Sequence, residues 1–182
     1  MKKILVVAIA SLMAFSAGAQ KIGRVNFNEL VMLSPEMDAA RETIAASQKE
    51  AEETYAAMVE EYQTKYSQYQ QKNASWTAAI KESKEKELYD IQNRIQEFQQ
   101  NISQELQQQQ SQLVAPINEK ASNVVMEIAK AKGLDILMEA TQALYFSDNV
   151  IDITAEARKA LGIPEGRTME ALQAELAAQQ QK

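Results

Sequence analysis

The sequence predicts a mainly α protein with a small β part, in which a long antiparallel helical hairpin, a coiled-coil arm, projects from a small β-barrel-like oligomerisation body. Three observations predict this fold class. Residues 36–115 contain neither Gly nor Pro and are rich in Ala, Glu, Gln and Lys, which are strong helix formers. Apolar residues recur through this stretch in steps of three and four, which is the helical period. Three short apolar segments outside it are typical of strands.

The N-terminal residues are typical of a cleaved signal peptide, predicted to span residues 1–19. Lys2 and Lys3 form a positive start, an apolar run follows, and residues 17–19 offer a small-residue cleavage site. The apolar run is about a dozen residues long, shorter than the roughly 20 that a membrane-spanning helix needs. We therefore expect cleavage after Ala19, export, and no stable insertion in a membrane.

The arm is expected to span residues 35–115 and to begin at a well-marked point. Ser34 is a good N-cap, and Pro35 suits the first helical position. Glu36 and Asp38 favour the positive end of the helix dipole. The helix therefore has a strong start and meets no Gly or Pro within residues 36–115.

Two apolar seams predict that this helix folds back on itself near residue 75. When the two halves are paired as antiparallel neighbours, Ala51 meets Phe98 and Tyr62 meets Leu88, and the paired residue numbers sum to 149 or 150. Turn and cap residues nearby place the expected turn near residues 73–77. Each helix of about 40 residues would be roughly 60 Å long at about 1.5 Å per residue. The first seam holds Met37, Ile44, Gln48, Ala51, Tyr55, Met58, Tyr62 and Tyr69, and the second holds Ile80, Leu88, Ile91, Ile95, Phe98, Ile102, Leu106 and Leu113.

The oligomerisation body is expected to comprise residues 20–34 and 116–163. Short apolar runs bounded by turn residues predict strands at residues 22–27, 134–138 and 143–146. Three short strands cannot bury a core alone, and a single two-helix arm has a narrow core. Both deficits disappear if several chains pool their strands in one small barrel, so we expect an oligomer.

Helix ends in the body are marked by individual residues. The helix that leaves the arm is expected to continue through a kink at Pro116 and to stop at Gly133. A short helix is expected to be capped by Thr154 and ended by Gly162. The tail, residues 164–182, has a weak amphipathic pattern and a Gln-rich end, and it is expected to be partly disordered.

The chain contains no Cys and no His. This excludes thiol nucleophiles, disulfides, Cys/His zinc sites and Ser-His-Asp triads. We therefore predict no catalytic, cofactor-binding or metal-binding residues and no enzymatic activity. The acidic stretch at residues 50–61 is interpreted as a solvated helix face, because no pocket-forming sequence surrounds it. The net charge of −6 and the export signal disfavour nucleic-acid binding.

Several motifs resemble those of the Skp/OmpH family of periplasmic chaperones. They are residues 21–26 (KIGRVN), 133–137 (GLDIL), 143–145 (ALY) and 152–154 (DIT), and the layout of nearly all of the mature chain is similar, with a longer tail after Gly162. The resemblance implies a periplasmic homotrimer in which a β-barrel body carries three hairpin arms around a cavity that holds unfolded outer-membrane proteins without ATP. The arm of this chain departs from the basic arms of that family, with 14 acidic and 8 basic residues in 36–115. No lipopolysaccharide or lipid site is carried over.

Tyr66, Tyr89 and Trp76 are the candidate client-contact residues. Tyr66 and Tyr89 lie off the apolar seams and are expected to face the cavity. Trp76, at the predicted tip, either anchors a client or packs over the turn. The stripe of tyrosines at positions 55, 62 and 69 is open to two interpretations, client contact or a seam that faces the second helix, and its helical spacing favours the seam.

The sequence and the resemblance together predict an ATP-independent periplasmic holdase chaperone without cofactors, which binds unfolded outer-membrane proteins between the arms of an oligomer and prevents their aggregation. Its expected partners are these clients and other copies of the chain. The alternative is a structural coiled-coil adaptor of the envelope that binds a folded partner. An adaptor needs a contiguous apolar stripe on the arms beyond the seams, and the sequence offers little of one.

Overall fold

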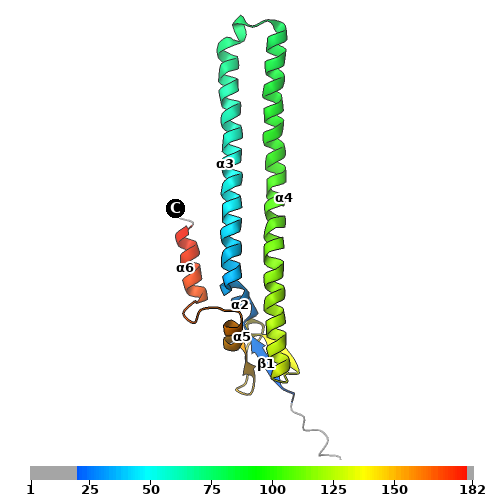
Figure 1. Cartoon of the computed structure of the whole chain (residues 1–182), viewed down its shortest axis with the longest axis vertical. Helices are drawn as coiled ribbons and strands as arrows, with labels where there is room; N and C mark the ends of the chain where they lie inside the picture. Colours follow the sequence, from blue (N-terminus) through cyan, green and yellow to red (C-terminus); the bar gives the residue numbers. More distant parts are fainter. Residues whose placement is uncertain (1–19, 180–182) are drawn as a thin grey trace, which may run out of the picture. The chain divides into compact units, whose positions relative to one another are not determined.

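The computed structural model describes residues 20–179, which form two compact units; the predicted signal peptide lies outside them. The second unit is Glu36–Ile117, and the described residues before and after it make up the first. Helices account for most of the described chain, and one small sheet has three strands (Figure 1). These observations confirm the prediction of a mainly α protein with a small β part.

Two long helices dominate the second unit. Helix α3 spans Pro35–Lys72, α4 spans Ala78–Ala131, and a single 3-10 turn, Asn73–Ser75, separates them. Within the second unit α3 and α4 lie side by side (Figure 1). The Ser75 hydroxyl donates a hydrogen bond to the Lys72 carbonyl at 2.8 Å, which closes the turn. The Thr77 hydroxyl accepts a hydrogen bond from the Ile80 amide at 3.4 Å, so Thr77 caps the start of α4.

Helix α4 continues past Pro116 and ends where glycine allows the chain to turn. Gly133 has a φ of +64°, a conformation that is costly for residues with a side chain. Its amide donates to the Lys130 carbonyl at 3.0 Å, and the Leu134 amide donates to the Ala129 carbonyl at 3.0 Å. This pair of bonds is a Schellman motif, and it confirms the predicted stop at Gly133.

The sheet of the first unit has parallel strands in the order β2-β1-β3. The central strand β1 spans Ile22–Val25 and pairs with β2, Ile136–Glu139, and with β3, Ile151–Asp152. Among the described residues of one chain these strands form an open sheet and do not close into a barrel.

The strand predicted at residues 143–146 is wrong, because this segment has no regular strand structure. The central strand β1 is already paired on both sides, and within one chain the segment does not pair with the outer edge of β2 or of β3. The apolar residues that suggested a strand are exposed instead: Leu144 is 109% and Tyr145 is 80% exposed.

The strand predicted at residues 22–27 ends early because a helix begins at Phe27. Helix α2 spans Phe27–Leu33 and was not anticipated. The Asn26 side chain accepts a hydrogen bond from the Glu29 amide at 3.1 Å and donates to the Glu29 carboxylate at 3.0 Å. This reciprocal arrangement resembles a capping box, and it overrides the strand-like pattern of the preceding residues.

The short helix after β3 is α5, Thr154–Ala160, and Thr154 does not cap it as predicted. Its hydroxyl accepts a hydrogen bond from the Asn26 amide at 3.0 Å and so links α5 to the end of β1. Its amide donates to the Asp152 carboxylate at 2.9 Å. The predicted end at Gly162 is confirmed, because that residue has a φ of +71°.

The segment expected to be a partly disordered tail contains helix α6, Met169–Gln179. The Thr168 hydroxyl accepts a hydrogen bond from the Ala171 amide at 3.1 Å, which caps the helix. Leu172 is buried, and α6 contacts α2. The burial of Leu172 against the rest of the first unit stabilises α6, although its amphipathic pattern is weak.

Helix α2 packs against both α5 and α6, and its buried face contributes to the core of the first unit. Leu30, Leu33 and Ile153 are fully buried. The other buried apolar residues of this unit are Val25, Val31, Ala121, Val125, Ala157, Leu161, Ile163 and Leu172.

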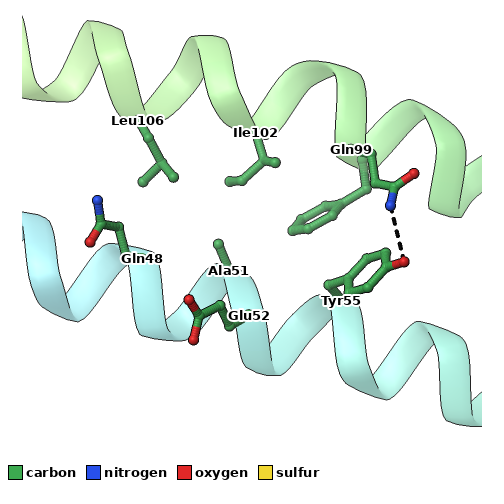
Figure 2. Close-up of a pocket in the computed structure, with 8 residues that line it drawn as sticks. Gln48, Ala51, Glu52, Tyr55, Gln99, Ile102 and Leu106 are labelled. Atoms are coloured by element: carbon green, nitrogen blue, oxygen red, sulfur yellow. Dashed lines mark hydrogen bonds between the residues drawn. The ribbon is translucent and has the colours of Figure 1, made fainter. Parts of the chain in front are cut away.

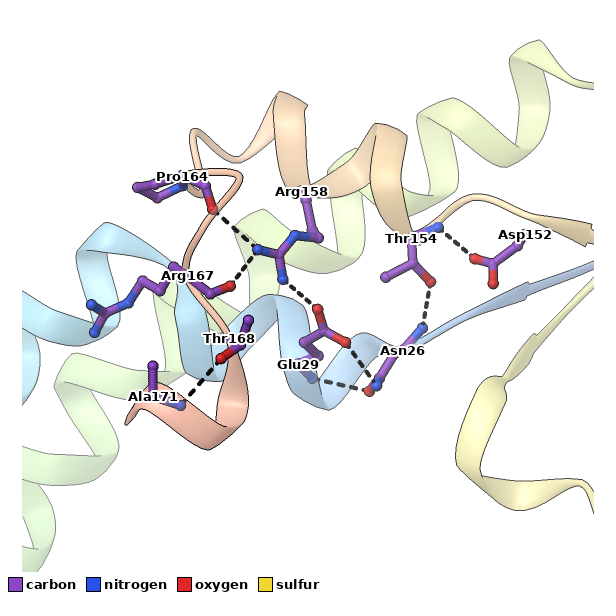
Figure 3. A network of polar contacts seen from close by, with 9 residues as sticks. All are labelled: Asn26, Glu29, Asp152, Thr154, Arg158, Pro164, Arg167, Thr168 and Ala171. Carbon is purple, nitrogen blue, oxygen red and sulfur yellow. Dashed lines mark hydrogen bonds and ion pairs between the residues drawn. The ribbon is translucent and has the colours of Figure 1, made fainter. Parts of the chain in front are cut away.

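Arg158 links three segments of this unit (Figure 3). Its guanidinium forms an ion pair with Glu29 of α2, and it donates hydrogen bonds to the carbonyls of Pro164 and Arg167. The side chains of Arg158 and Glu29 are only 16% and 23% exposed, so the pair is well shielded from water. The contacts fix the chain between α5 and α6 at the surface of α2.

Candidate functional site

The candidate site lies on the helix pair, a name used here for the parts of α3 and α4 within Glu36–Ile117. Side chains join the two helices along much of their length. The Tyr62 hydroxyl accepts from Gln92 at 2.8 Å, the Tyr55 hydroxyl accepts from Gln99 at 3.0 Å, and Tyr69 donates to Glu85. The tyrosine stripe therefore faces α4, which confirms the seam interpretation over direct client contact for these three residues.

Charged pairs strengthen the contact near the turn. Glu87 of α4 forms ion pairs with Lys65 of α3 and, at 2.8 Å, with Lys84. Hydrogen bonds from these two lysines lower the pKa of Glu87 to about 2. Arg94 pairs with Glu61 at 2.9 Å. These pairs are partly exposed, so each adds little stability. Lys65–Glu87 and Arg94–Glu61 join the two helices, whereas Lys84–Glu87 lies within α4.

Charge is unevenly distributed along the helix pair. Residues 62–94, here the tip section, contain six basic and four acidic residues, a net charge of +2. Residues 36–61 and 95–117, here the acidic section, contain ten acidic and two basic residues, a net charge of −8. The net negative charge of the helix pair therefore lies in the acidic section.

The seam is incompletely filled where Ala51 faces larger residues (Figure 2). Ala51, Phe98, Ile102 and Leu106 line two open grooves, of about 660 and 430 Å³. The larger groove is also lined by Gln48, Glu52, Tyr55 and Gln99, and the smaller one by Ser47, Glu50, Thr54, Glu105 and Gln109. The prediction that Ala51 faces Phe98 agrees with this lining, but the alanine leaves space between the helices.

The grooves were not identified from the sequence, although a signal was present. The seam positions Gln48 and Ala51 are polar or small, whereas the positions around them carry larger side chains. The grooves lie between two cross-helix contacts, the Tyr55–Gln99 bond and a 2.9 Å bond from Gln109 to the Ser47 hydroxyl. These bonds hold the helices in register while the apolar lining stays open.

None of the three predicted client-contact residues lines either groove. Tyr66 is 43% exposed and stacks on Tyr62, with ring centroids 5.9 Å apart. Tyr89 is 62% exposed. Trp76 is half-buried and meets the edge of Tyr69 at 5.8 Å, so it packs over the turn, which was the second of its two interpretations.

Exposed apolar side chains in the first unit were also missed. They come from the two outer strands and the chain segment between them: Ile136, Met138, Leu144, Tyr145 and Ile151. Strands β2 and β3 are the edges of the sheet. Edge strands with exposed apolar side chains are a ready surface for pairing with another chain.

Neither a metal centre nor a membrane span is apparent in the part of the chain that the structure describes. Within residues 20–179 no three His, Cys, Asp or Glu side chains are placed to share a metal ion. No helix within that range is long and apolar enough to cross a bilayer. Some acidic side chains of the helix pair form ion pairs, such as Glu53 and Glu61. Others, Glu50, Glu52 and Glu105, line the grooves.

These features define a class of protein: a mainly helical chain with a long pair of helices, exposed aromatic and acidic side chains along that pair, and a small parallel sheet. The family model described as outer membrane protein (OmpH-like) matches residues 21–161. The chain therefore belongs to the OmpH-like family, whose members are periplasmic chaperones rather than enzymes and bind outer membrane proteins. A chaperone-type role follows from this membership, and the initial resemblance is confirmed. A search of curated proteins gave no match.

Proposed function

We propose that this chain is an ATP-independent holdase that binds unfolded outer-membrane proteins between the helical arms of an oligomer and prevents their aggregation. The observation that carries the proposal is the open seam of the helix pair. Most seam residues are only half-buried, and apolar side chains remain accessible at Ala51, Phe98 and Ile102. An unfolded chain can be held by many such weak contacts without one rigid pocket.

The exposed aromatic residues support the same role. Tyr66 and Tyr89 offer large amphipathic surfaces to a client, and Trp76 presents part of its ring at the turn. The excess of negative charge in the acidic section would keep a loaded complex soluble. No nucleotide is needed, because binding and release depend on summed weak contacts.

The proposed assembly is a homotrimer joined through the first unit. The apolar surface at Ile136, Met138, Leu144, Tyr145 and Ile151 is accessible to water in one chain, and burying it against other copies would remove both sheet edges. The open sheet would then become part of a shared barrel-like body. The helix pairs would act as arms, and export by the cleaved signal peptide would place the assembly in the periplasm.

The test is the aggregation of a urea-denatured outer-membrane β-barrel on dilution, followed by turbidity. Full-length mature protein should suppress turbidity at stoichiometric excess in the absence of nucleotide. A variant shortened by matched deletions in α3 and α4 around residue 75, with the first unit intact, should suppress it much less. Equal protection by the shortened variant, or none by the full-length protein, would contradict the holdase proposal and favour an adaptor that binds a folded partner.

A further inference from the structure

We propose that the two grooves at Ala51 form a subsite for client segments in which a large apolar side chain lies next to Lys or Arg. The inference rests on the proposed holdase function and specifies the client sequence that the arm prefers. It also assigns a role to the acidic section of the helix pair that the tip section does not share.

The apolar part of the subsite comes from four residues common to both grooves. Ala51 lies opposite Phe98, Ile102 and Leu106, and because Ala51 is small the helices leave open space on both faces of the pair. The larger groove has a volume of about 660 Å³, which is in the range of small-molecule binding sites and exceeds what one aromatic side chain needs. An aromatic or aliphatic side chain of a client would cover apolar surface that is otherwise in contact with water.

The charged part of the subsite comes from three glutamates at the groove edges. Glu52 lines the larger groove, and Glu50 and Glu105 line the smaller one. Among the described residues no Lys or Arg lines either groove. The nearest basic residue along α3, Lys49, forms an ion pair with Glu53 at 3.7 Å. A client cation would therefore meet an excess of carboxylates.

The net negative charge of the acidic section argues against two other ligands for the grooves. The acidic section of a second copy has a net charge of −8, so two such sections would repel each other if one chain docked in the groove of another. An anionic lipid surface would be repelled for the same reason. An extended cationic and apolar chain segment is the occupant that fits both the lining and the charge.

The experiment measures fluorescence anisotropy of labelled 12-residue peptides with full-length mature protein. The first peptide alternates Lys with Phe, the second replaces Phe by Ser, and the third replaces Lys by Glu. We expect the first to bind at least about tenfold more tightly than either of the others, because only it can bury apolar side chains and pair with the glutamates. Its affinity should fall as salt is raised.

Two protein variants locate the binding. Ala51→Leu should fill the grooves and weaken binding of the Lys-Phe peptide about tenfold, while helix content by circular dichroism is kept or raised because the seam is better packed. The triple variant Glu50→Gln, Glu52→Gln, Glu105→Gln should weaken binding about fivefold and flatten its salt dependence. The matched control Glu82→Gln, Glu119→Gln, Glu127→Gln removes the same charge elsewhere and should bind like the unchanged protein.

Unchanged binding by folded Ala51→Leu, or an equal loss in the charge-matched control, would overturn the subsite. Turbidity assays distinguish this from a failure of the proposed function. If the unchanged protein suppresses aggregation but these variants bind the peptide normally, the subsite is wrong and the holdase proposal stands. If the unchanged protein fails to suppress aggregation, the holdase proposal is wrong whatever the peptides do.

Discussion

Replacing Leu30 by Ala should lower the free energy of unfolding of the first unit by about 2–5 kcal/mol, because it removes a fully buried side chain and leaves a cavity. Leu30 lies on α2, which contacts both α5 and α6, so the loss affects three helices together. Hydrogen exchange at the amides of β1 and α2, measured at one protein concentration, reports the stability of this unit separately from the helix pair.

The control is Met126→Ala, which truncates a side chain that is 46% exposed on α4. Its effect should be within about 1 kcal/mol, since close to half of this residue's surface is already in contact with water. Similar losses of protection in both variants would contradict the assignment of Leu30 to the core.

Replacing Gly23 by Val should destabilise the sheet by about 1–3 kcal/mol through overpacking. A Cβ at this position would lie 2.4 Å from Leu134 Cδ1, 3.0 Å from Leu137 Cδ1 and 3.3 Å from the carbonyl oxygen of Ile151. The two leucine side chains can move, but the Ile151 carbonyl is part of β3. Because β1 pairs with both other strands, the change should reduce protection from hydrogen exchange in all three.

Gly166→Val is the matched control for this variant. A Cβ at Gly166 would meet nothing within 4 Å, so the same added atoms should change the free energy of unfolding by about 0.5 kcal/mol or less. If Gly23→Val and Gly166→Val change the free energy of unfolding by the same small amount, β1 is not packed as described.

The long helices could be predicted from the sequence because their determinants are local. Helix formers without Gly or Pro specify α3 and most of α4, and Gly133 and Gly162 end helices through a positive φ that few other residues adopt. The break after Lys72 also falls where the sequence supplies turn and cap residues, Asn73, Ser75 and Thr77. Each of these features depends on residues close together in the chain.

The sheet could not be predicted as well because its pairing is not local. Ile22 pairs with Ile136 and Gly23 with Ile151, and no pattern within a short segment identifies a partner more than 100 residues away. Residues 143–146 have a strand-like composition, but within one chain they pair with neither outer edge of the sheet. Helix α2, by contrast, had a local signature in Asn26 and Glu29, and the apolar run before it obscured that signature.

The grooves of the candidate site were missed because a heptad pattern describes which residues face each other and not how well they fill space. The pattern predicts that Ala51 lies opposite Phe98 and does not give the space left between them. The structure has too little side-chain volume at this point, so this pairing leaves two grooves. The volume left between α3 and α4 depends on how far apart the helices lie. That separation is set by the larger residues and the cross-helix hydrogen bonds on either side of Ala51.

The most direct test of the proposed homotrimeric holdase is the mass in solution of the mature protein, alone and mixed with a denatured outer-membrane β-barrel, by light scattering coupled to size exclusion. We expect three times the mass of one mature chain when the protein is alone, and a complex heavier by one client when it is mixed, in the absence of nucleotide. A stable folded monomer at micromolar concentration that leaves the client to aggregate would contradict it.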